Sequence, residues 1–212
     1  NQLKKRGIHD PEVLKAMWDV DRSLFVPEDM KSHAYEDRPL PIGKEQTISQ
    51  PYIVAYMAQH LQARPEDVVL EVGTGCGYNA AVLSKLVSQV YSIEIIEWLA
   101  TLAEENLRNA GIKNVSTRFG DGYQGWTEKA PFDGITLTAA PPDIPEPLKE
   151  QLRIGGRLLA PRPQLPQLLF GGELGEPVER QLVGALADEW GVRPATGGKA
   201  TWFSLSRNSS KE

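Results

Sequence analysis

Residues 68–77 read Val-Val-Leu-Glu-Val-Gly-Thr-Gly-Cys-Gly, a short apolar run that leads into three alternate glycines. Such a run is typical of a buried strand in a parallel sheet. Similar runs recur downstream, separated by segments in which apolar residues have helical spacing. The predicted strands cover residues 68–72, 89–95, 114–119, 132–138 and 156–160, and the predicted helices cover 80–86, 97–110 and 145–152. This alternation predicts βαβ units and therefore an α/β fold with a doubly wound, mostly parallel sheet.

Two further helices are predicted ahead of this sheet. One covers residues 10–20, with Asp10 as the N-cap and Pro11 as the first helical residue. The other covers residues 51–61, where apolar residues recur at helical spacing. The stretch 33–45 between them is rich in proline and charge and is predicted to be a loop. We therefore expect an N-terminal helical extension to the sheet.

The composition excludes several classes of protein. The 212 residues include 23 Lys and Arg against 28 Asp and Glu, so the formal net charge is −5 and a general nucleic-acid-binding surface is not expected. The single cysteine, Cys76, excludes an internal disulfide and a site with several thiolate ligands, and no metal site is predicted. No apolar run reaches the ~18 residues of a membrane span, and the first residues lack the apolar core of a signal peptide. A cytoplasmic protein that does not enter the membrane is expected.

The residues that follow each predicted strand are the candidates for a binding site, because ligands of such sheets bind beyond the carboxyl ends of the strands. Gly73, Gly75 and Gly77 let the backbone turn and approach a ligand without a Cβ in the way. Their G-x-G-x-G spacing is the form found in S-adenosylmethionine-dependent methyltransferases, whereas a dinucleotide fingerprint would need glycine in place of Tyr78. A strand-to-helix turn that needs flexibility is the alternative explanation.

Acidic residues accompany the glycines. Glu94, at the end of the second strand, is suited to accept both ribose hydroxyls of a nucleoside, and Asp121, after the third, is suited to accept an adenine amine next to the Gly122 backbone. Taken alone, Glu94 is equally explained by a solvated strand end, and Asp121 is better explained by a turn, which Gly-Asp-Gly favours. Glu71, Glu94 and Asp121 together would repel a pyrophosphate, so a cationic cofactor such as S-adenosylmethionine fits better.

Further motifs surround the glycine loop. They read Phe25-Val26-Pro27, Gln46-Thr47-Ile48-Ser49-Gln50-Pro51-Tyr52, Phe119-Gly120-Asp121-Gly122 and Thr138-Ala139-Ala140-Pro141-Pro142. With them, residues 6–161 resemble the protein-L-isoaspartate (D-aspartate) O-methyltransferase family. The glycine loop marks only a methyltransferase, whereas the segments 47–51 and 138–141 are far more specific to this family.

The resemblance implies a Rossmann-like methyltransferase that repairs damaged proteins. Such an enzyme moves the methyl group of S-adenosylmethionine to the free α-carboxylate of L-isoaspartyl residues and leaves S-adenosyl-L-homocysteine. The methyl ester then collapses to a succinimide, which reopens partly to normal aspartate. Ser49 matches the family's active-site serine, and the expected cofactor-binding residues are Thr47, Ile48, Gly73, Thr74, Gly75, Gly77, Glu94, Asp121 and Gly122. The expected substrate-binding residues are Ser49, Gln50, Ala139 and Ala140. The expected partners are isoaspartyl proteins and peptides, and the enzyme is expected to be a monomer.

Ser49 lies just before the helix that Pro51 begins. Its hydroxyl and nearby backbone N–H groups are expected to hold the substrate carboxylate at the helix N-terminus, where the dipole favours an anion. A plain N-cap serine is the alternative. The small residues at 138–142 suit the approach of a peptide backbone, and tight packing explains them equally well. A carboxylate is already ionised at pH 7, so no general base is required and no histidine is assigned a catalytic role.

The resemblance ends near Pro161. The family's hairpin of alternating apolar residues is missing from 162–212, where only 168–170 and 181–183 are predicted as strand remnants and 199–205 remain unassigned. A shifted reading frame is one hypothesis for this difference. We predict one methyltransferase domain with a helical substrate-side segment (1–62), a cofactor-binding core (63–161) and an atypical completion of the sheet (162–212). Two alternatives stay open: another S-adenosylmethionine-dependent methyltransferase, or a cofactor-binding domain inactivated by its altered tail.

Overall fold

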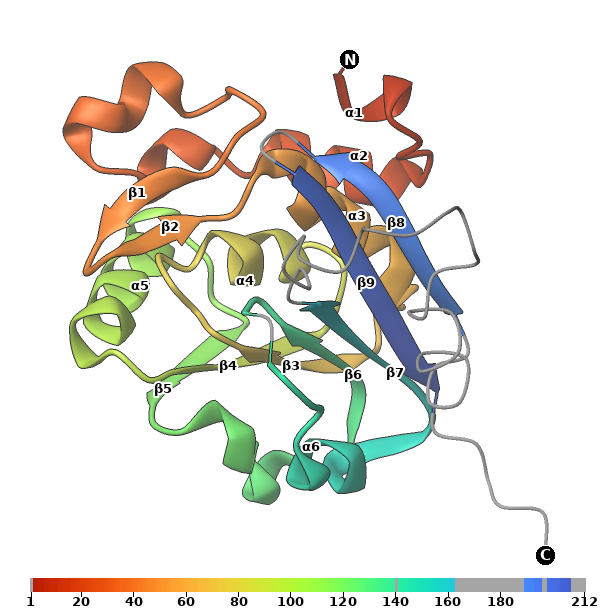
Figure 1. Cartoon of the computed structure of the whole chain (residues 1–212). Helices are drawn as coiled ribbons and strands as arrows, with labels where there is room; N and C mark the ends of the chain where they lie inside the picture. The colour runs from red at the N-terminus through yellow and green to blue at the C-terminus, as the bar shows by residue number, and fades with distance from the viewer. Residues whose placement is uncertain (1, 140, 163–188, 196–197, 207–212) are drawn as a thin grey trace, which may run out of the picture.

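The predicted alternation of strands and helices is present in the computed structural model, which describes residues 2–139, 141–162, 189–195 and 198–206. In these residues a seven-stranded sheet has the order β5-β4-β3-β6-β7-β9-β8 (Figure 1). Its strands are β3 (Val68–Val72), β4 (Gln89–Glu94), β5 (Val115–Phe119), β6 (Phe132–Leu137), β7 (Leu152–Arg162), β8 (Glu189–Ala195) and β9 (Gly198–Ser206). The helices between them are α4 (Tyr78–Leu83), α5 (Glu97–Asn109) and α6 (Glu146–Gln151), with the short 3-10 helices η3 (Gly122–Gln124) and η4 (Thr127–Lys129) after β5.

Strand β3 lies in the middle of the sheet and is buried on both faces. On one face Val69 packs with buried residues of α3 (Pro51–Leu61) and α4, and on the other Leu70 packs with Leu148 of α6. Because both faces are covered, the strand reads as a continuous apolar run rather than an alternating one. This is the physical reason that residues 68–72 were recognisable as a strand.

The order of the strands reverses at β3. Parallel pairing joins β3 to β4 on one side and to β6 on the other, and the chain continues outward from β4 to β5 and from β6 to β7. Just beyond these strands the Gly73 N–H donates to the Ile93 carbonyl at 2.8 Å, and the Thr138 N–H donates to the Val72 carbonyl at 2.9 Å. The loops after β3 and β6 therefore leave the sheet side by side, at the point where ligands of doubly wound sheets bind.

The N-terminal segment consists of short elements. They are α1 (Gln2–Lys5), α2 (Pro11–Asp19), η1 (Arg22–Phe25), η2 (Glu28–His33), β1 (Leu40–Gly43), β2 (Gln46–Ile48) and α3. The predicted start of α2 is confirmed, because the Asp10 side chain accepts hydrogen bonds from the N–H groups of Glu12 and Val13 at 2.9 and 3.2 Å. The predicted range of α3 is also confirmed.

The prediction of a loop across residues 33–45 is wrong in its second half. Leu40–Gly43 forms β1, which pairs antiparallel with β2, and the side chains of Leu40 and Ile42 are buried. Within β1 the buried side chains of Leu40 and Ile42 alternate with the exposed Pro41 and Gly43, as in a strand, and the charged Lys44 and Glu45 beyond them are exposed. Lys44 and Glu45 form the tip of the hairpin with positive φ angles.

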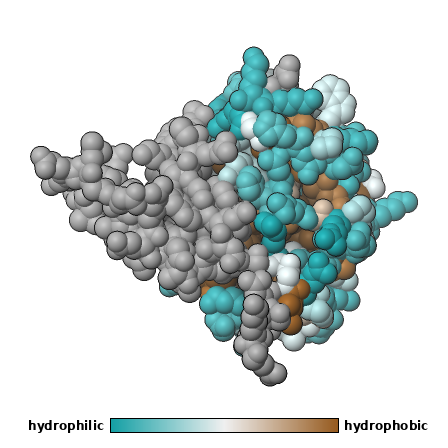
Figure 2. Space-filling view, turned by 90° about the vertical axis from the view of Figure 1, so that its right-hand side faces the viewer, coloured by the Kyte–Doolittle hydropathy of each residue, from teal (hydrophilic) through white to brown (hydrophobic). Residues whose placement is uncertain are grey.

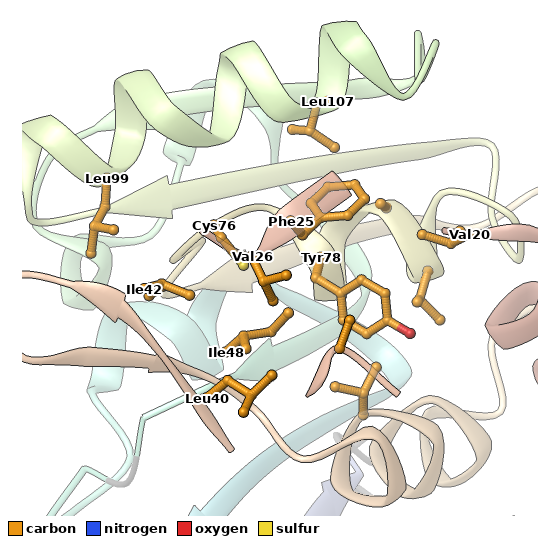
Figure 3. Packing of buried hydrophobic residues seen from close by; sticks show 14 of the residues in the cluster. Val20, Phe25, Val26, Leu40, Ile42, Ile48, Cys76, Tyr78, Leu99 and Leu107 are labelled. Carbon is orange, nitrogen blue, oxygen red and sulfur yellow. The ribbon is translucent and has the colours of Figure 1, made fainter. Parts of the chain in front are cut away.

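The β1–β2 hairpin packs directly on the elements that follow the glycine loop. Figure 3 shows its buried side chains beside Cys76 and Tyr78, with α5 on the other side. The Phe25 and Tyr78 rings meet edge to face, with centroids 5.6 Å apart. The labelled side chains of this cluster are Val20, Phe25, Val26, Leu40, Ile42, Ile48, Cys76, Tyr78, Leu99 and Leu107. This packing holds residues 47–49 next to residues 73–77, although the two segments are distant in sequence.

The end of the chain contains strands that were not predicted. Residues 199–205, left unassigned above, lie in β9, which pairs antiparallel with β7 and with β8. The prediction that 168–170 and 181–183 are the only strand remnants after Pro161 is therefore wrong. Both of these segments lie outside the described residues. Pairing with the otherwise open edge of β7 favours an extended backbone here despite a weak local pattern.

The longest helix among the residues that the structure describes is α5, with 13 residues. None of their helices combines the length and the apolar character needed to cross a membrane. Among the residues that carry a hydropathy colour in Figure 2, hydrophilic ones predominate and hydrophobic ones lie between them. Among the large apolar side chains, Trp18 is the most exposed of those described, at 86%.

Candidate active site

A cavity of about 390 Å³ lies at the carboxyl ends of β3, β4 and β6, where the strand order reverses. Eight of the predicted site residues line it: Thr47, Ile48, Ser49, Gly73, Thr74, Gly75, Glu94 and Ala139. Gln50, Gly77, Asp121 and Gly122 are not among its lining residues, and Ala140 lies outside the described part of the chain. The structure thus brings the 47–49 segment, the glycine loop and the end of β4 around one space.

Gly73, the first residue of the glycine loop, is required by sterics as well as by flexibility. Gly73 has φ +97°, and a Cβ built there would lie 2.2 Å from Thr138 Oγ1. That hydroxyl donates to the Gly73 carbonyl at 2.7 Å, which joins the loops after β3 and β6. Gly75 also has a positive φ, at +56°. An L-residue would be strained at both positions, so the sharp turn beside the cavity depends on these glycines.

Glu94 is buried at the end of β4 and is held in one orientation. Its carboxylate accepts the Gly75 N–H at 2.7 Å through Oε2 and the Ile96 N–H at 3.0 Å through Oε1. A carboxylate has about four acceptor positions, so each oxygen can still accept a ligand hydroxyl. The arrangement suits a ligand with two neighbouring hydroxyl groups, as the sequence predicted for a ribose.

Glu71 does not belong to the cavity wall. It is fully buried in β3, where its carboxyl group accepts from Asn79 Nδ2 at 2.7 Å and from the Ser92 hydroxyl. Burial raises the pKa of Glu71 to about 7, although these two hydrogen bonds oppose the shift. Glu71 is therefore partly protonated at neutral pH, and it contributes less negative charge to the cavity than an exposed glutamate would. This corrects the expectation that Glu71 acts with Glu94 and Asp121 to repel a pyrophosphate.

The Glu71 contacts continue to the cavity through a network that was not predicted. The hydroxyls of Thr74 and Ser92 lie 2.6 Å apart, and Thr74 is a wall residue of the cavity. Ser92 is a fully buried polar residue in β4, and its position between Tyr91 and Ile93 in a predicted strand is the sequence signal that was available. This network supports the glycine loop from beneath.

Asp121 and Gly122 lie at the start of η3. The exposed Asp121 side chain accepts from the Tyr123 N–H at 2.9 Å and from Gln124 Nε2 at 3.3 Å, as in the turn considered as the alternative. Gly122 is buried, and a Cβ there would lie 2.5 Å from Val72 Cγ1, so close packing against β3 requires glycine. The cofactor contacts of Asp121 and Gly122 stay predictions.

Ser49 lies half-buried in the cavity wall, directly before α3. The N-cap of α3 is Gln50, so the reading of Ser49 as a plain N-cap serine is wrong. The expected use of the helix N-terminus also needs correction, because the Tyr52 N–H in the first turn donates to Asp37 Oδ1 at 3.0 Å. The Asp37 carboxylate thus occupies part of this anion site. Asp37 belongs to the segment ahead of β1, and no local sequence pattern relates that segment to α3.

Other lining residues were missed, and they are mainly apolar or aromatic. They are Gln46, Val54, Cys76, Tyr78, Asn79, Ile95, Ile96 and Leu99, and the wall also contains Thr138 from the segment 138–142 that was expected on the substrate side. Burial raises the pKa of the Cys76 thiol to about 11, so it is neutral at pH 7 and unsuited to act as a nucleophile. No group of three or more His, Cys, Asp or Glu side chains in the described residues is placed to hold a metal ion. The cavity therefore offers an oriented carboxylate, a tight backbone turn and apolar walls.

Comparison with known proteins identifies the relatives of this chain. Residues 1–180 match the sequence model of the protein-L-isoaspartate(D-aspartate) O-methyltransferase family. The protein-L-isoaspartate O-methyltransferase of Synechococcus sp. (strain JA-2-3B'a(2-13)) is 56% identical over 165 residues, which cover 78% of this chain and 68% of that protein.

Solved structures give the same result. A protein-L-isoaspartate O-methyltransferase superposes with a TM-score of 0.70 and 36% identity, over 76% of this chain and 53% of that one, so the similarity spans about half of its length. The Plasmodium falciparum structure of a protein-L-isoaspartate O-methyltransferase in complex with S-adenosyl-L-homocysteine gives a TM-score of 0.66 and 27% identity, over 77% and 82% of the two chains. The predicted Rossmann-like methyltransferase fold is thus confirmed. The chain belongs to the protein-L-isoaspartate(D-aspartate) O-methyltransferase family.

Proposed function

We propose that this protein is a repair enzyme that methylates the α-carboxylate of L-isoaspartyl residues with S-adenosylmethionine and releases S-adenosyl-L-homocysteine. The observation that carries the proposal is the single cavity that Glu94, the glycine loop and Ser49 share. A cofactor subsite and a substrate-side serine must lie in one space if a methyl group is to pass directly between their ligands. Membership in the family supports the same reaction.

The residues of the cavity fit S-adenosylmethionine. Glu94 presents a fixed carboxylate that suits the two ribose hydroxyls, and the absence of a Cβ at Gly73 lets the loop turn sharply against Thr138 beside the cavity. When bound, this cofactor supplies a methyl group on a cationic sulfonium. The negative charge of Glu94 favours a cationic ligand over a pyrophosphate.

The remaining walls are suited to a reaction between opposite charges. Ile48, Val54 and Leu99 are buried apolar residues that line the cavity, so this part of the wall offers water no hydrogen bond. Water stabilises separated charges more than a transition state in which they vanish, so a dry site of fixed geometry favours transfer. No general base is needed, because the substrate carboxylate is ionised at pH 7.

On the substrate side, we assign Ser49 and Ala139 to the wall that faces the isoaspartyl residue. Gln50 acts indirectly in this proposal, because its buried amide donates to the Asp37 carbonyl at 2.7 Å and holds the segment before β1. Isoaspartyl proteins and peptides are the proposed partners. A cytoplasmic location, a monomeric state and the absence of a nucleic-acid partner are part of the same proposal.

The test combines a binding measurement with a transfer assay. Affinity for S-adenosyl-L-homocysteine is measured by calorimetry, and methyl transfer is measured with isoaspartyl and aspartyl versions of one peptide. Transfer to the isoaspartyl version alone is the expected result. Binding without transfer to either peptide would instead support a cofactor-binding domain without this activity, and transfer to an unrelated acceptor would support another methyltransferase.

A further inference from the structure

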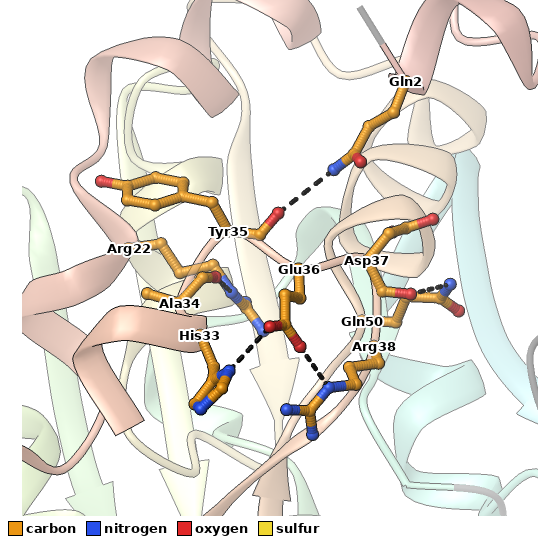
Figure 4. Close-up of polar contacts among 9 residues, drawn as sticks. All are labelled: Gln2, Arg22, His33, Ala34, Tyr35, Glu36, Asp37, Arg38 and Gln50. Atoms are coloured by element: carbon orange, nitrogen blue, oxygen red, sulfur yellow. Dashed lines mark hydrogen bonds and ion pairs between the residues drawn. The ribbon is translucent and has the colours of Figure 1, made fainter. Parts of the chain in front are cut away.

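Arg22 is a buried cation that contacts the segment carrying Ser49. It lies in η1 with 1% of its surface exposed. Its Nε donates to the Ala34 carbonyl at 2.8 Å, and its Nη2 donates to the Ser49 carbonyl at 2.8 Å. Figure 4 shows the guanidinium beside Ala34. One side chain thus joins three segments: η1, the turn after η2 and the segment that leads into α3.

The Arg22 guanidinium forms no ion pair with a carboxylate in the described part of the chain. Its Nη1 is buried without a hydrogen-bond partner there, and the face of the guanidinium lies over the Tyr78 ring, 4.7 Å from its centroid. Burial lowers the pKa of Arg22 from its ordinary value, yet arginine stays charged at pH 7. A buried charge with an unsatisfied donor is costly, so its presence calls for an explanation.

The nearby carboxylates of Asp37 and Glu36 contact other side chains. Asp37 forms an ion pair with Arg6, and the same Asp37 accepts the Tyr52 N–H. Glu36 contacts His33 and Arg38, as the dashed lines in Figure 4 show. The group of Arg6, Arg22 and Asp37 therefore has a net positive charge next to the start of α3.

This positive charge adjoins the cavity. Ser49 and Tyr78, the two residues that Arg22 contacts toward the glycine loop, both line the cavity. Because the low dielectric of buried surroundings weakens electrostatic screening, a charge in this position acts on an anion in the cavity without touching it. The N-terminus of α3, in contrast, already has Asp37 on its first turn.

We propose that Arg22 is a positioning residue for methyl transfer: it fixes Ser49 in the cavity wall and supplies the positive potential that favours a substrate carboxylate there. The inference rests on the proposed function, since it assigns the anion to the isoaspartyl α-carboxylate. It also identifies the local cationic feature that an acidic chain requires in order to bind an anionic substrate.

Two substitutions separate the two parts of this role. Arg22→Lys keeps the charge but loses the planar group that reaches both carbonyls, so kcat is expected to fall about tenfold while KM for the isoaspartyl peptide stays within about threefold. Arg22→Gln loses the charge as well, so KM is expected to rise at least about tenfold in addition. Affinity for S-adenosyl-L-homocysteine is expected to stay within about threefold in both variants.

Arg118→Lys is the matched control. Arg118 also donates to a backbone carbonyl, that of Gly125 at 2.8 Å, and its guanidinium lies 4.3 Å from the centroid of the Trp126 ring. It lies in β5 at the edge of the sheet and does not line the cavity. Its substitution by lysine is expected to leave kcat, KM and cofactor affinity within about twofold of the wild type.

The experiment uses the full chain, with circular dichroism to establish that each variant is folded. An unchanged KM in folded Arg22→Gln would overturn the inference, and so would a loss of S-adenosyl-L-homocysteine affinity as large as the loss of transfer. If Arg22→Gln does not fold, Arg22→Lys decides, and an unchanged kcat in that variant is the overturning result. Absence of isoaspartyl transfer by the wild type would reject the proposed function together with this inference, whereas normal transfer by the variants rejects the inference alone.

Discussion

Replacement of Glu71 by glutamine is expected to change how the stability of the protein depends on pH. In the folded chain the pKa of Glu71 is raised from 4.5 to about 7 because the group is buried in β3. Between these two values the folded chain binds a proton that the unfolded chain has released. The free energy of unfolding of the wild type therefore falls as pH rises through this window.

The magnitude follows from the pKa difference. Each pKa unit corresponds to about 1.4 kcal/mol, so a difference of about 2.5 between the unfolded and folded chains amounts to roughly 3 kcal/mol. This stability is fully present below about pH 4.5 and is lost as pH rises past about 7. Asp21 and Glu36 have lowered pKa values, so their contributions are lost in the opposite direction, as pH falls below about 4.

The assay is urea unfolding, followed by circular dichroism, at a series of pH values from about 5 to 8. The difference in unfolding free energy between the wild type and Glu71→Gln is expected to fall by about 2–3 kcal/mol across this range. Glu105→Gln is the control, since Glu105 is exposed on α5 and its replacement is expected to leave the pH dependence of the wild type unchanged. If the difference between wild type and Glu71→Gln does not vary with pH, the raised pKa of Glu71 is refuted.

Three further predictions concern the cavity. Ser49→Ala is expected to reduce kcat/KM for an isoaspartyl peptide about tenfold or more, as for a lost hydrogen bond to a charged group, while affinity for S-adenosyl-L-homocysteine stays nearly unchanged; equal turnover in both proteins would exclude Ser49 from the substrate site. Glu94→Gln is expected to weaken S-adenosyl-L-homocysteine binding about 10- to 100-fold in calorimetry, and wild-type affinity in this variant would place the ribose elsewhere. Gly73→Ala is expected to cost about 3 kcal/mol of stability in urea unfolding, because its Cβ would meet Thr138 Oγ1 at 2.2 Å at φ +97°. Gly111→Ala, at φ +69° with no atom within 4 Å of the new Cβ, is expected to cost only about 1 kcal/mol, and equal losses at the two glycines would contradict the steric argument.

Local sequence patterns predicted most of the sheet and part of the candidate site. A strand covered on both faces must be apolar throughout, and a loop that turns with positive φ beside a ligand must contain glycine, so residues 68–77 carried both signals. The end of β4 at Glu94 could be placed by its distance from that loop. The cavity contains most of the residues predicted in this way.

The sequence by itself therefore determined the α/β class, the position of the glycine loop and the family resemblance, because each depends on residues close together in the chain. The tertiary structure decided the pairing of β9 with β7, the protonation of Glu71, and the contacts of Asp37 with α3 and of Arg22 with Ser49. Each of these depends on burial or on contacts between segments distant in sequence. Part of the site was thus readable from the chain, whereas its other wall residues and the charges around it depend on how the chain folds.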